Sequence, residues 1–153
     1  MRVIGLFAAA AAAAAALSTS GGVALASAPN GITPPPGVSC QSKTDNPHAS
    51  KTLRYEYVID KSYLESGCTV EVSSLTLHGI LLLGSLSSGQ QIAEASATVY
   101  NTVGVNDAVY AEVLCSTFGN GKYSAKTTGS FTYEGETYPV DPTSQDDISV
   151  TGC

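Results

Sequence analysis

Residues 75–83 read Leu-Thr-Leu-His-Gly-Ile-Leu-Leu-Leu, the most apolar run in the chain beyond residue 39. A helix needs about 20 apolar residues to cross a membrane, so this run is far too short to do so. Its length and composition favour a β-strand that is buried on both faces. Gly79, in the middle of the run, predicts a bulge or a bend in that strand.

The segment before this run predicts the first strand of the domain. Residues 52–59 alternate between apolar and polar side chains, which is typical of a strand with one buried face. The apolar face consists of Leu53, Tyr55, Tyr57 and Ile59. We expect this strand to lie half-buried in an antiparallel sheet, with a loop over residues 61–67 and a second strand from Thr69.

Two further strands are predicted after the apolar run and the flexible turn at residues 84–89. Residues 90–102 alternate, and although their alanines also suit a helix, the end Thr98-Val99-Tyr100 favours a strand. The strand after the next turn has an apolar face that ends in a cysteine, which should therefore point inward. The residues of that face are Val109, Ala111, Val113 and Cys115.

The C-terminal part of the chain predicts a hairpin and a last strand. Residues 123–128 and 130–133 resemble strands, and Glu134-Gly135-Glu136 suits a hairpin turn. Residues 139–146 predict a loop, and a final strand should end at Cys153. About seven or eight strands without a long helix indicate an all-β domain, an antiparallel β-sandwich of immunoglobulin-like type. A small closed β-barrel is the alternative.

The first residues predict export from the cell. Met1-Arg2 precedes an alanine-rich apolar run and two competing A-x-A cleavage motifs, at residues 24–26 and 26–28. We prefer cleavage after Ala26, which makes residues 1–26 a signal peptide. Residues 27–39 contain four prolines and predict an exposed tether, so the domain itself spans residues 40–153. The expected location is extracellular, with no membrane association once the signal is removed.

The net charge of the chain argues against two classes of binding partner. The formal net charge is −6, and beyond Lys126 there are five acidic residues and no Lys or Arg. Nucleic acids and anionic membranes both require basic patches, so neither is expected as a partner. We interpret the acidic C-terminal segment as a solvated surface that keeps the protein soluble.

The four cysteines and the residues that follow them form a distinctive sequence pattern. Cys40 is followed by Asp45-Asn46-Pro47-His48 and Ser50, Cys115 by Gly121-Lys122-Tyr123, and Cys153 ends the chain. Together with Cys68 and the alanine-rich signal, this pattern resembles a set of small exported four-cysteine β-proteins of actinobacteria. The resemblance implies an architecture and a compartment, but no activity.

Four cysteines in an exported chain predict two disulfides, and the absence of a C-x-x-C pair argues against a zinc or thioredoxin-like site. Three pairings are possible. We favour Cys40 with Cys68 and Cys115 with Cys153, which would fix each terminal segment to its sequence neighbour. The second choice is Cys68 with Cys115 across two sheets, leaving Cys40 to join Cys153.

Catalytic and metal-binding candidates are few. His48 and His78 are the only histidines, and neither belongs to a metal-binding spacing, so structural roles are expected for both. No G-x-S-x-G elbow marks a nucleophilic serine. Glu134 and Glu136 suit a solvated turn better than a pair of catalytic acids. We expect no cofactor, and the residues of the acidic end that could bind Ca²⁺ weakly, Asp141, Asp146 and Asp147, lack the EF-hand spacing.

The sequence therefore predicts a monomeric, secreted, non-catalytic binding module for an extracellular protein or glycan. Eight tyrosines and no tryptophan supply amphipathic rings for contact. Loops 84–89 and 102–107 are expected to carry the contact surface as well. The residues assigned to that surface are Tyr55, Tyr57, Ser87, Ser88, Val103 and Val105. A protease inhibitor is the alternative function, and a small secreted hydrolase is a third.

Overall fold

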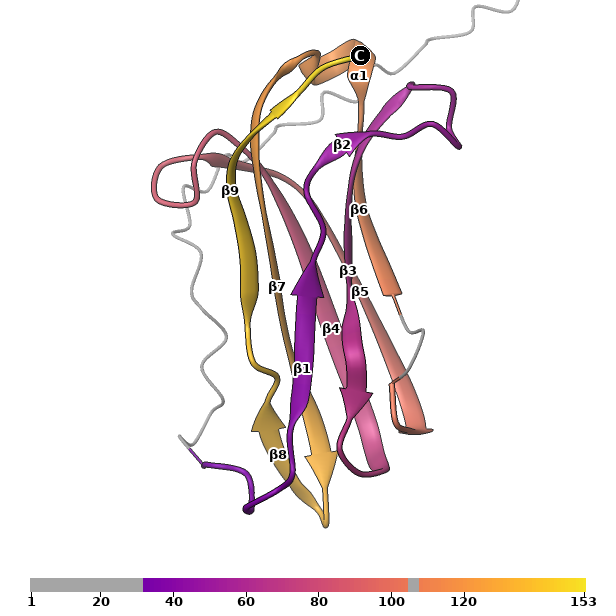
Figure 1. Cartoon of the computed structure of the whole chain (residues 1–153), viewed down its shortest axis with the longest axis vertical. Coiled ribbons are helices and arrows are strands. Elements are labelled where there is room, and N and C mark those ends of the chain that lie inside the picture. The colour runs from indigo at the N-terminus through magenta and orange to yellow at the C-terminus, as the bar shows by residue number, and fades with distance from the viewer. Residues whose placement is uncertain (1–31, 105–107) are drawn as a thin grey trace, which may run out of the picture.

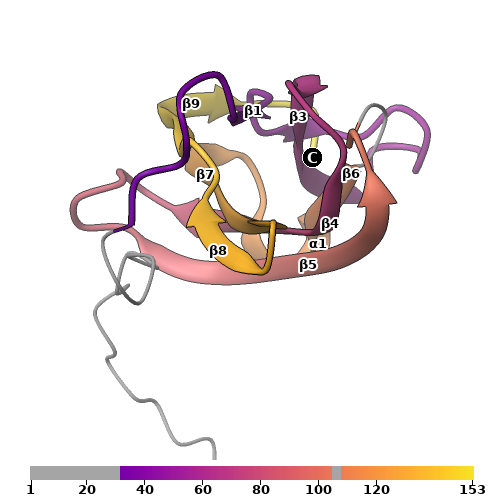
Figure 2. The ribbon, with the colours of Figure 1, turned by 90° about the horizontal axis from the view of Figure 1, so that it is seen from below.

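The computed structural model describes residues 32–104 and 108–153, which form a two-layered β-sandwich (Figures 1 and 2). The elements are β1 (Cys40–Thr44), β2 (His48–Ala49), β3 (Tyr57–Cys68), β4 (Val72–Leu83), β5 (Gln90–Thr102), β6 (Ala108–Leu114), α1 (Cys115–Phe118), β7 (Gly121–Tyr133), β8 (Glu136–Pro139) and β9 (Thr143–Val150).

All strand pairs within the two sheets are antiparallel. In the four-stranded sheet, β3 pairs with β1 and β2 along one side and with β6 along the other. In the five-stranded sheet, β4 lies between β5 and β7, and the far side of β7 pairs with β8 and β9. Neither sheet closes on itself within the described residues, so the sandwich prediction is confirmed and the barrel alternative is wrong.

The apolar run of β4 is half-buried, and the prediction that both its faces are buried is wrong. Leu75, Leu77 and Leu81 face the core, whereas His78 is exposed on the outer face. The four-stranded sheet covers only one face of β4, because no third layer exists in the described part of the chain. Gly79 makes no bulge, since the register shift beside β5 lies between Leu81 and Leu82.

Gly79 instead lets the two sheets approach closely. A Cβ added at this position would lie 2.7 Å from the Ser62 Oγ of the facing strand β3. That distance is well inside van der Waals contact, so only glycine fits unless the Ser62 side chain moves.

Strand β3 differs most from its prediction. It begins at Tyr57 and continues through residues 61–67, where a loop was expected. Residues 51–55 form turns instead of a strand, with Arg54 and Tyr55 at φ 53° and 62°. The inner face of β3 consists of Val58, Asp60, Ser62 and Leu64. The predicted apolar face is therefore the outer one, because two polar side chains of β3 point into the core.

The later strands follow the predictions more closely. Strand β5 has the predicted bounds, and β6 buries Val109, Ala111 and Val113 while Cys115 opens the short helix α1 with its side chain buried. The β7–β8 turn uses Glu134 and Gly135 at φ 50° and 85°, as a hairpin turn requires. The last strand begins and ends earlier than predicted: β9 starts at Thr143, inside the loop expected over residues 139–146, and ends at Val150.

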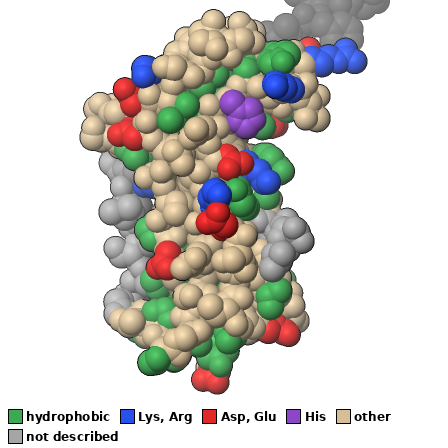
Figure 3. Space-filling view, viewed as in Figure 1, with side chains coloured by type: hydrophobic (Ala, Val, Ile, Leu, Met, Phe, Trp, Pro, Cys, Tyr) green, Lys and Arg blue, Asp and Glu red, His purple; other side chains and the backbone are tan. Residues whose placement is uncertain are grey.

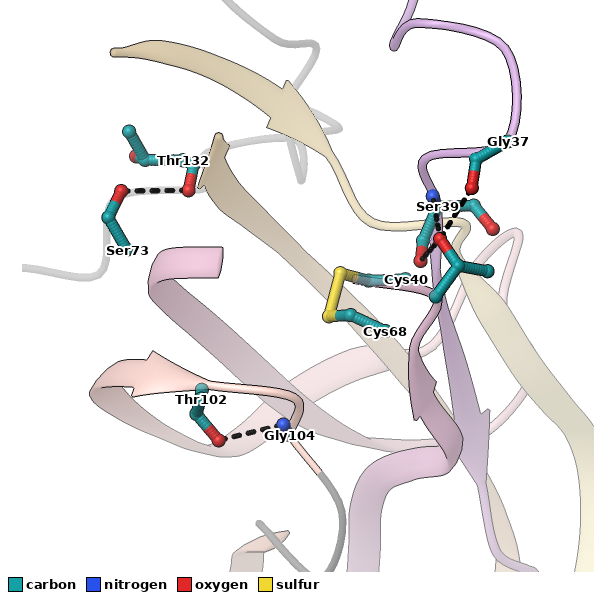
Figure 4. Close-up of a disulfide and its surroundings, with 9 residues drawn as sticks. Gly37, Ser39, Cys40, Cys68, Ser73, Thr102, Gly104 and Thr132 are labelled. Carbon is teal, nitrogen blue, oxygen red and sulfur yellow. Dashed lines mark hydrogen bonds between the residues drawn. A yellow bond between two sulfur atoms is a disulfide. The ribbon is translucent and has the colours of Figure 1, made fainter. Parts of the chain in front are cut away.

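The two disulfides confirm the favoured pairing and lie at opposite ends of the sandwich. Cys40 and Cys68 are direct neighbours on β1 and β3. Beside them, the Thr69 hydroxyl accepts a hydrogen bond from Ser39 and donates one to Gly37 (Figure 4). At the other end, Cys115 joins Cys153, which links the four-stranded sheet to the segment that follows β9.

The expected tether is partly packed onto the domain. Val38 is 9% exposed and belongs to the hydrophobic core cluster, and Ile32 packs against that cluster. The predicted signal peptide and residues 27–31 lie outside the described residues. In the part of the chain that is described, no helix has the length and apolar character needed to cross a bilayer.

Candidate binding surface

The outer face of the four-stranded sheet carries a patch that we call the tyrosine face, consisting of Tyr57, Ile59, Tyr63, Tyr110 and Leu114. These residues occupy alternate positions on β3 and β6, so their side chains share one side of the sheet. The register places Tyr57 opposite Leu114 and Lys61 opposite Tyr110. Tyr110 is 50% exposed and Leu114 is 45% exposed, so this apolar surface is open to solvent.

Polar contacts fix the orientation of the Tyr63 ring, at one end of this face. The Nζ of Lys61 lies 4.5 Å from the centroid of the Tyr63 ring, close enough for a cation–π contact. The Tyr63 hydroxyl donates a hydrogen bond to Asp45 Oδ1 at 3.2 Å. The Asp45 amide in turn donates to the Lys61 carbonyl at 3.0 Å. The ring is therefore held from two sides before any ligand arrives.

Charged side chains of both signs lie within and beside the tyrosine face. On the side of the molecule that Figure 3 shows, acidic, basic and hydrophobic side chains are interspersed. Lys43 Nζ lies 2.5 Å from Glu65 Oε1 at one end, and the hydrogen bond to this carboxylate raises the pKa of Lys43 above its ordinary value. Glu112 on β6 stands opposite Ile59. Lys61 and Glu112 thus lie between the rows of Tyr57 and Tyr63, so the face mixes aromatic and aliphatic side chains with charges of both signs.

The contact residues predicted from the sequence do not form one surface. Tyr55 lies in the turn before β3 and does not share a strand face with Tyr57. Ser87 and Ser88 are exposed in the β4–β5 loop, at the same end of the sandwich as α1 (Figure 1). Val103 lies at the opposite end, where its carbonyl accepts a hydrogen bond from Cys68 at 2.6 Å. Val105 lies outside the described residues.

The interior holds a hydrogen-bonded cluster that the sequence patterns did not reveal. Asp60 is 0% exposed, and its Oδ2 accepts a hydrogen bond from Ser62 at 3.1 Å. Thr127 of the facing sheet donates to Ser62 at 2.7 Å, and the hydroxyls of Thr127 and Thr44 are 2.7 Å apart. Asp60 Oδ1 has no partner among the described residues.

This polar cluster separates the two apolar parts of the core. On β3, Asp60 and Ser62 lie between Val58 of one hydrophobic cluster and Leu64 of the other. Burial raises the pKa of Asp60 to about 7, with a smaller contribution from the negative charge of Asp45. Because the carboxyl group is sealed from solvent, it cannot reach a substrate.

The remaining candidate catalytic and metal-binding residues do not lie together in one site. His48 lies on β2 and His78 on β4, so the two histidines belong to different sheets. Asp146 is engaged locally, since its Oδ1 accepts hydrogen bonds from the Leu86 amide at 2.7 Å and the Ser124 hydroxyl at 2.8 Å. These hydrogen bonds lower the pKa of Asp146. Among the described residues, no group of three or more His, Cys, Asp or Glu side chains could hold a metal ion.

The pocket between the sheets is too small for a metabolite. It has a volume of about 50 Å³ and is lined by apolar residues of β4, β5 and β6. Ligand pockets of small-molecule-binding proteins usually measure about 300–1,000 Å³. The tyrosine face is therefore the best-supported contact surface among the described residues.

The comparison with known proteins identifies no family for this chain. No protein-family model matches the chain, and no curated protein or solved structure shows significant similarity to it. The resemblance to exported four-cysteine proteins thus stays a prediction from the sequence.

Proposed function

We propose that this protein is a secreted, non-catalytic binding module that uses the tyrosine face to bind an extracellular protein. The observation that carries the proposal is the orientation of β3. This strand directs Tyr57, Ile59 and Tyr63 to its outer side, where they are half-buried, while it fully buries Asp60 and Ser62. Proteins tend to depart from the usual apolar-in, polar-out pattern at functional sites.

The composition of the tyrosine face favours a protein over a glycan as the ligand. Aromatic rings can stack on sugars, but the aliphatic side chains of Ile59 and Leu114 offer a sugar no comparable contact. One side of the Tyr63 ring is also occupied by the Lys61 ammonium group. Tyrosine is enriched at protein–protein interfaces and among the residues that contribute most to binding.

The compartment fits this function. Two disulfides are compatible with an oxidising environment outside the cytosol. Secretion by the predicted signal peptide would place the domain in that environment. The tyrosine face would then lie on a sandwich that has one disulfide at each end.

A pull-down with a matched control tests the proposal. The tagged protein is incubated with the extracellular fraction of the producing organism, and the same is done with Tyr110→Ala and Tyr100→Ala. Both tyrosines are exposed, at 50% and 71%, but Tyr110 lies on the tyrosine face and Tyr100 on the other sheet. We expect Tyr110→Ala to weaken capture of a specific protein about tenfold or more, and Tyr100→Ala to leave it unchanged.

Three results would reject this function. Equal capture by wild-type protein and Tyr110→Ala would remove the tyrosine face from the interface. Binding to a carbohydrate panel that Tyr110→Ala abolishes would show that the ligand is a glycan. Stoichiometric inhibition of a serine protease by both wild-type protein and Tyr110→Ala would favour the inhibitor alternative instead.

A further inference from the structure

We propose that the β2–β3 loop, residues 50–56, is a processing site for an extracellular trypsin-like endoprotease. The enzyme would hydrolyse the peptide bond between Arg54 and Tyr55 and leave a folded protein of two chains that a disulfide joins. The loop protrudes from the sandwich at the end where α1 lies (Figures 1 and 2). This proposal does not rest on the binding function of the tyrosine face.

The β2–β3 loop contains the longest exposed run of the described residues. Residues 51–56 are all exposed, and no other run of exposed residues in the described part of the chain is as long. Exposed loops are the preferred sites of proteolytic cleavage in folded proteins. A protease can therefore reach the backbone of this loop while both sheets stay intact.

The basic residues of the loop select the class of protease. Lys51 and Arg54 are the only Lys or Arg residues that the structure describes outside a strand. The others are Lys43 on β1, Lys61 on β3, and Lys122 and Lys126 on β7. A residue that is hydrogen-bonded within a sheet is cut only after that part of the sheet opens. An enzyme that cleaves after Lys or Arg thus finds its accessible bonds in this loop.

The conformation of the loop depends on hydrogen bonds within the loop itself. Ser50 accepts one from the Tyr55 amide at 2.8 Å, through its carbonyl, and one from the Leu53 amide at 3.3 Å, through its hydroxyl. The Arg54 amide donates to the Lys51 carbonyl at 3.2 Å. Neither cationic side chain forms an ion pair with a described residue. The loop can therefore open without breaking a strand pair.

The backbone on both sides of the proposed bond is strained. Arg54 and Tyr55 have φ angles of 53° and 62°, in the left-handed region that disfavours residues other than glycine. An extended conformation in the active site of a protease would release this strain, which favours this bond over the one after Lys51. Water adds across the bond, so Arg54 gains a carboxylate and Tyr55 gains an ammonium group.

The two pieces would stay together after cleavage. Cys40 precedes the bond and Cys68 follows it, and these two cysteines form a disulfide. The ends of the loop are also held side by side, because β2 pairs with β3 and the Ser50 amide donates to the Tyr57 carbonyl at 2.8 Å. All residues of the tyrosine face follow the bond in the sequence, so cleavage does not divide that face.

Limited digestion of the oxidised protein with trypsin tests whether the bond is accessible. We expect one species on a non-reducing gel and two fragments after reduction, with the first cut after Arg54 by mass spectrometry. Far-UV circular dichroism should show that the cleaved protein is still folded. The combined variant Lys51→Gln and Arg54→Gln should be cut about tenfold more slowly, because its remaining lysines become accessible only when the sheets open.

Lys122→Gln is the matched control, since it removes an exposed cation from strand β7. It should be cut as fast as the wild type. A first cut at a lysine within a strand would overturn the proposal. Equal digestion of the wild type and the combined variant, or fragments that separate without reduction, would overturn it as well.

Sequencing the N-termini of the protein from the extracellular fraction of the producing organism tests whether this cleavage takes place there. We expect a second N-terminus at Tyr55, from chains cut after Arg54. If the extracellular protein has a single N-terminus, before Cys40, cleavage is confined to the added trypsin and the proposal is wrong.

Discussion

Ionisation of the buried Asp60 should make the stability of this protein fall between mildly acidic and neutral pH. The folded pKa is about 7, against an ordinary value of 3.8. A carboxyl group with a raised folded pKa binds its proton more tightly in the folded state. Its contribution to stability is therefore complete below pH 3.8 and decreases as the pH rises toward 7, above which it is lost.

The expected magnitude is large. Each pKa unit corresponds to about 1.4 kcal/mol, so a shift from 3.8 to about 7 corresponds to about 4 kcal/mol. A domain of this size is stable by about 5–15 kcal/mol in total. One buried carboxyl group thus controls a substantial fraction of the stability, because no cation lies near enough among the described residues to compensate its charge.

Asp60→Asn isolates this effect. The amide oxygen can still accept the hydrogen bond from Ser62, but the side chain no longer ionises. The amide nitrogen would take the place of Oδ1, which has no partner, so the variant should lose some stability at every pH. The pH dependence is therefore the informative quantity, not the absolute stability.

Urea unfolding followed by far-UV circular dichroism at several pH values from 4 to 8 provides the measurement. We expect the unfolding free energy of the wild type, relative to Asp60→Asn, to decrease by about 4 kcal/mol over this range. Glu112→Gln, at an exposed carboxylate on the adjacent strand β6, should keep the wild-type pH dependence. A constant difference between wild type and Asp60→Asn would show that Asp60 titrates normally and would refute the reasoning.

Two further substitutions test the packing between the sheets and the disulfides. Gly79→Ala should reduce the free energy of unfolding by about 1–3 kcal/mol, because its Cβ would lie 2.7 Å from Ser62 Oγ. If thermal unfolding of the variant agrees with that of the wild type within experimental error, the sheets are further apart than this distance implies. Cys115→Ser combined with Cys153→Ser removes a crosslink with a sequence separation of 38 residues and should cost about 3–4 kcal/mol in urea unfolding. Unchanged stability after that double substitution would contradict the predicted role of the terminal disulfide.

The sequence predicted the fold class and the crosslinks because both depend on regular signals. Strand β5 and the inner face of β6 follow simple alternation, and the hairpin at Gly135 uses turn residues with a known conformation. The disulfide pairing followed from the expectation that each terminal segment is fixed near its sequence neighbour. None of these features needed a contact between distant polar residues.

The strand faces of β3 and β4 could not be predicted because each depends on the facing sheet. The apolar run of β4 gives no alternation from which an outer face could be identified. In β3, Asp60 and Ser62 are buried because Thr127 and Thr44 bring hydroxyl groups from other strands to the same place. The partners lie 65 positions apart for Ser62 and Thr127, which no local pattern can reveal.

The reversed faces of β3 connect the core with the proposed function. If β3 were turned over, Tyr57, Ile59 and Tyr63 would face inward in place of Asp60 and Ser62. Lys61 would then be buried as well, and Val58 and Leu64 would face the solvent. The observed orientation instead buries a carboxyl group with an unpaired oxygen, which is costly unless the arrangement provides something else. What it provides is a partly exposed row of aromatic and aliphatic side chains beside Tyr110 and Leu114. The pH-dependent stability and the binding surface are thus two consequences of one feature, the choice of which face of β3 points outward.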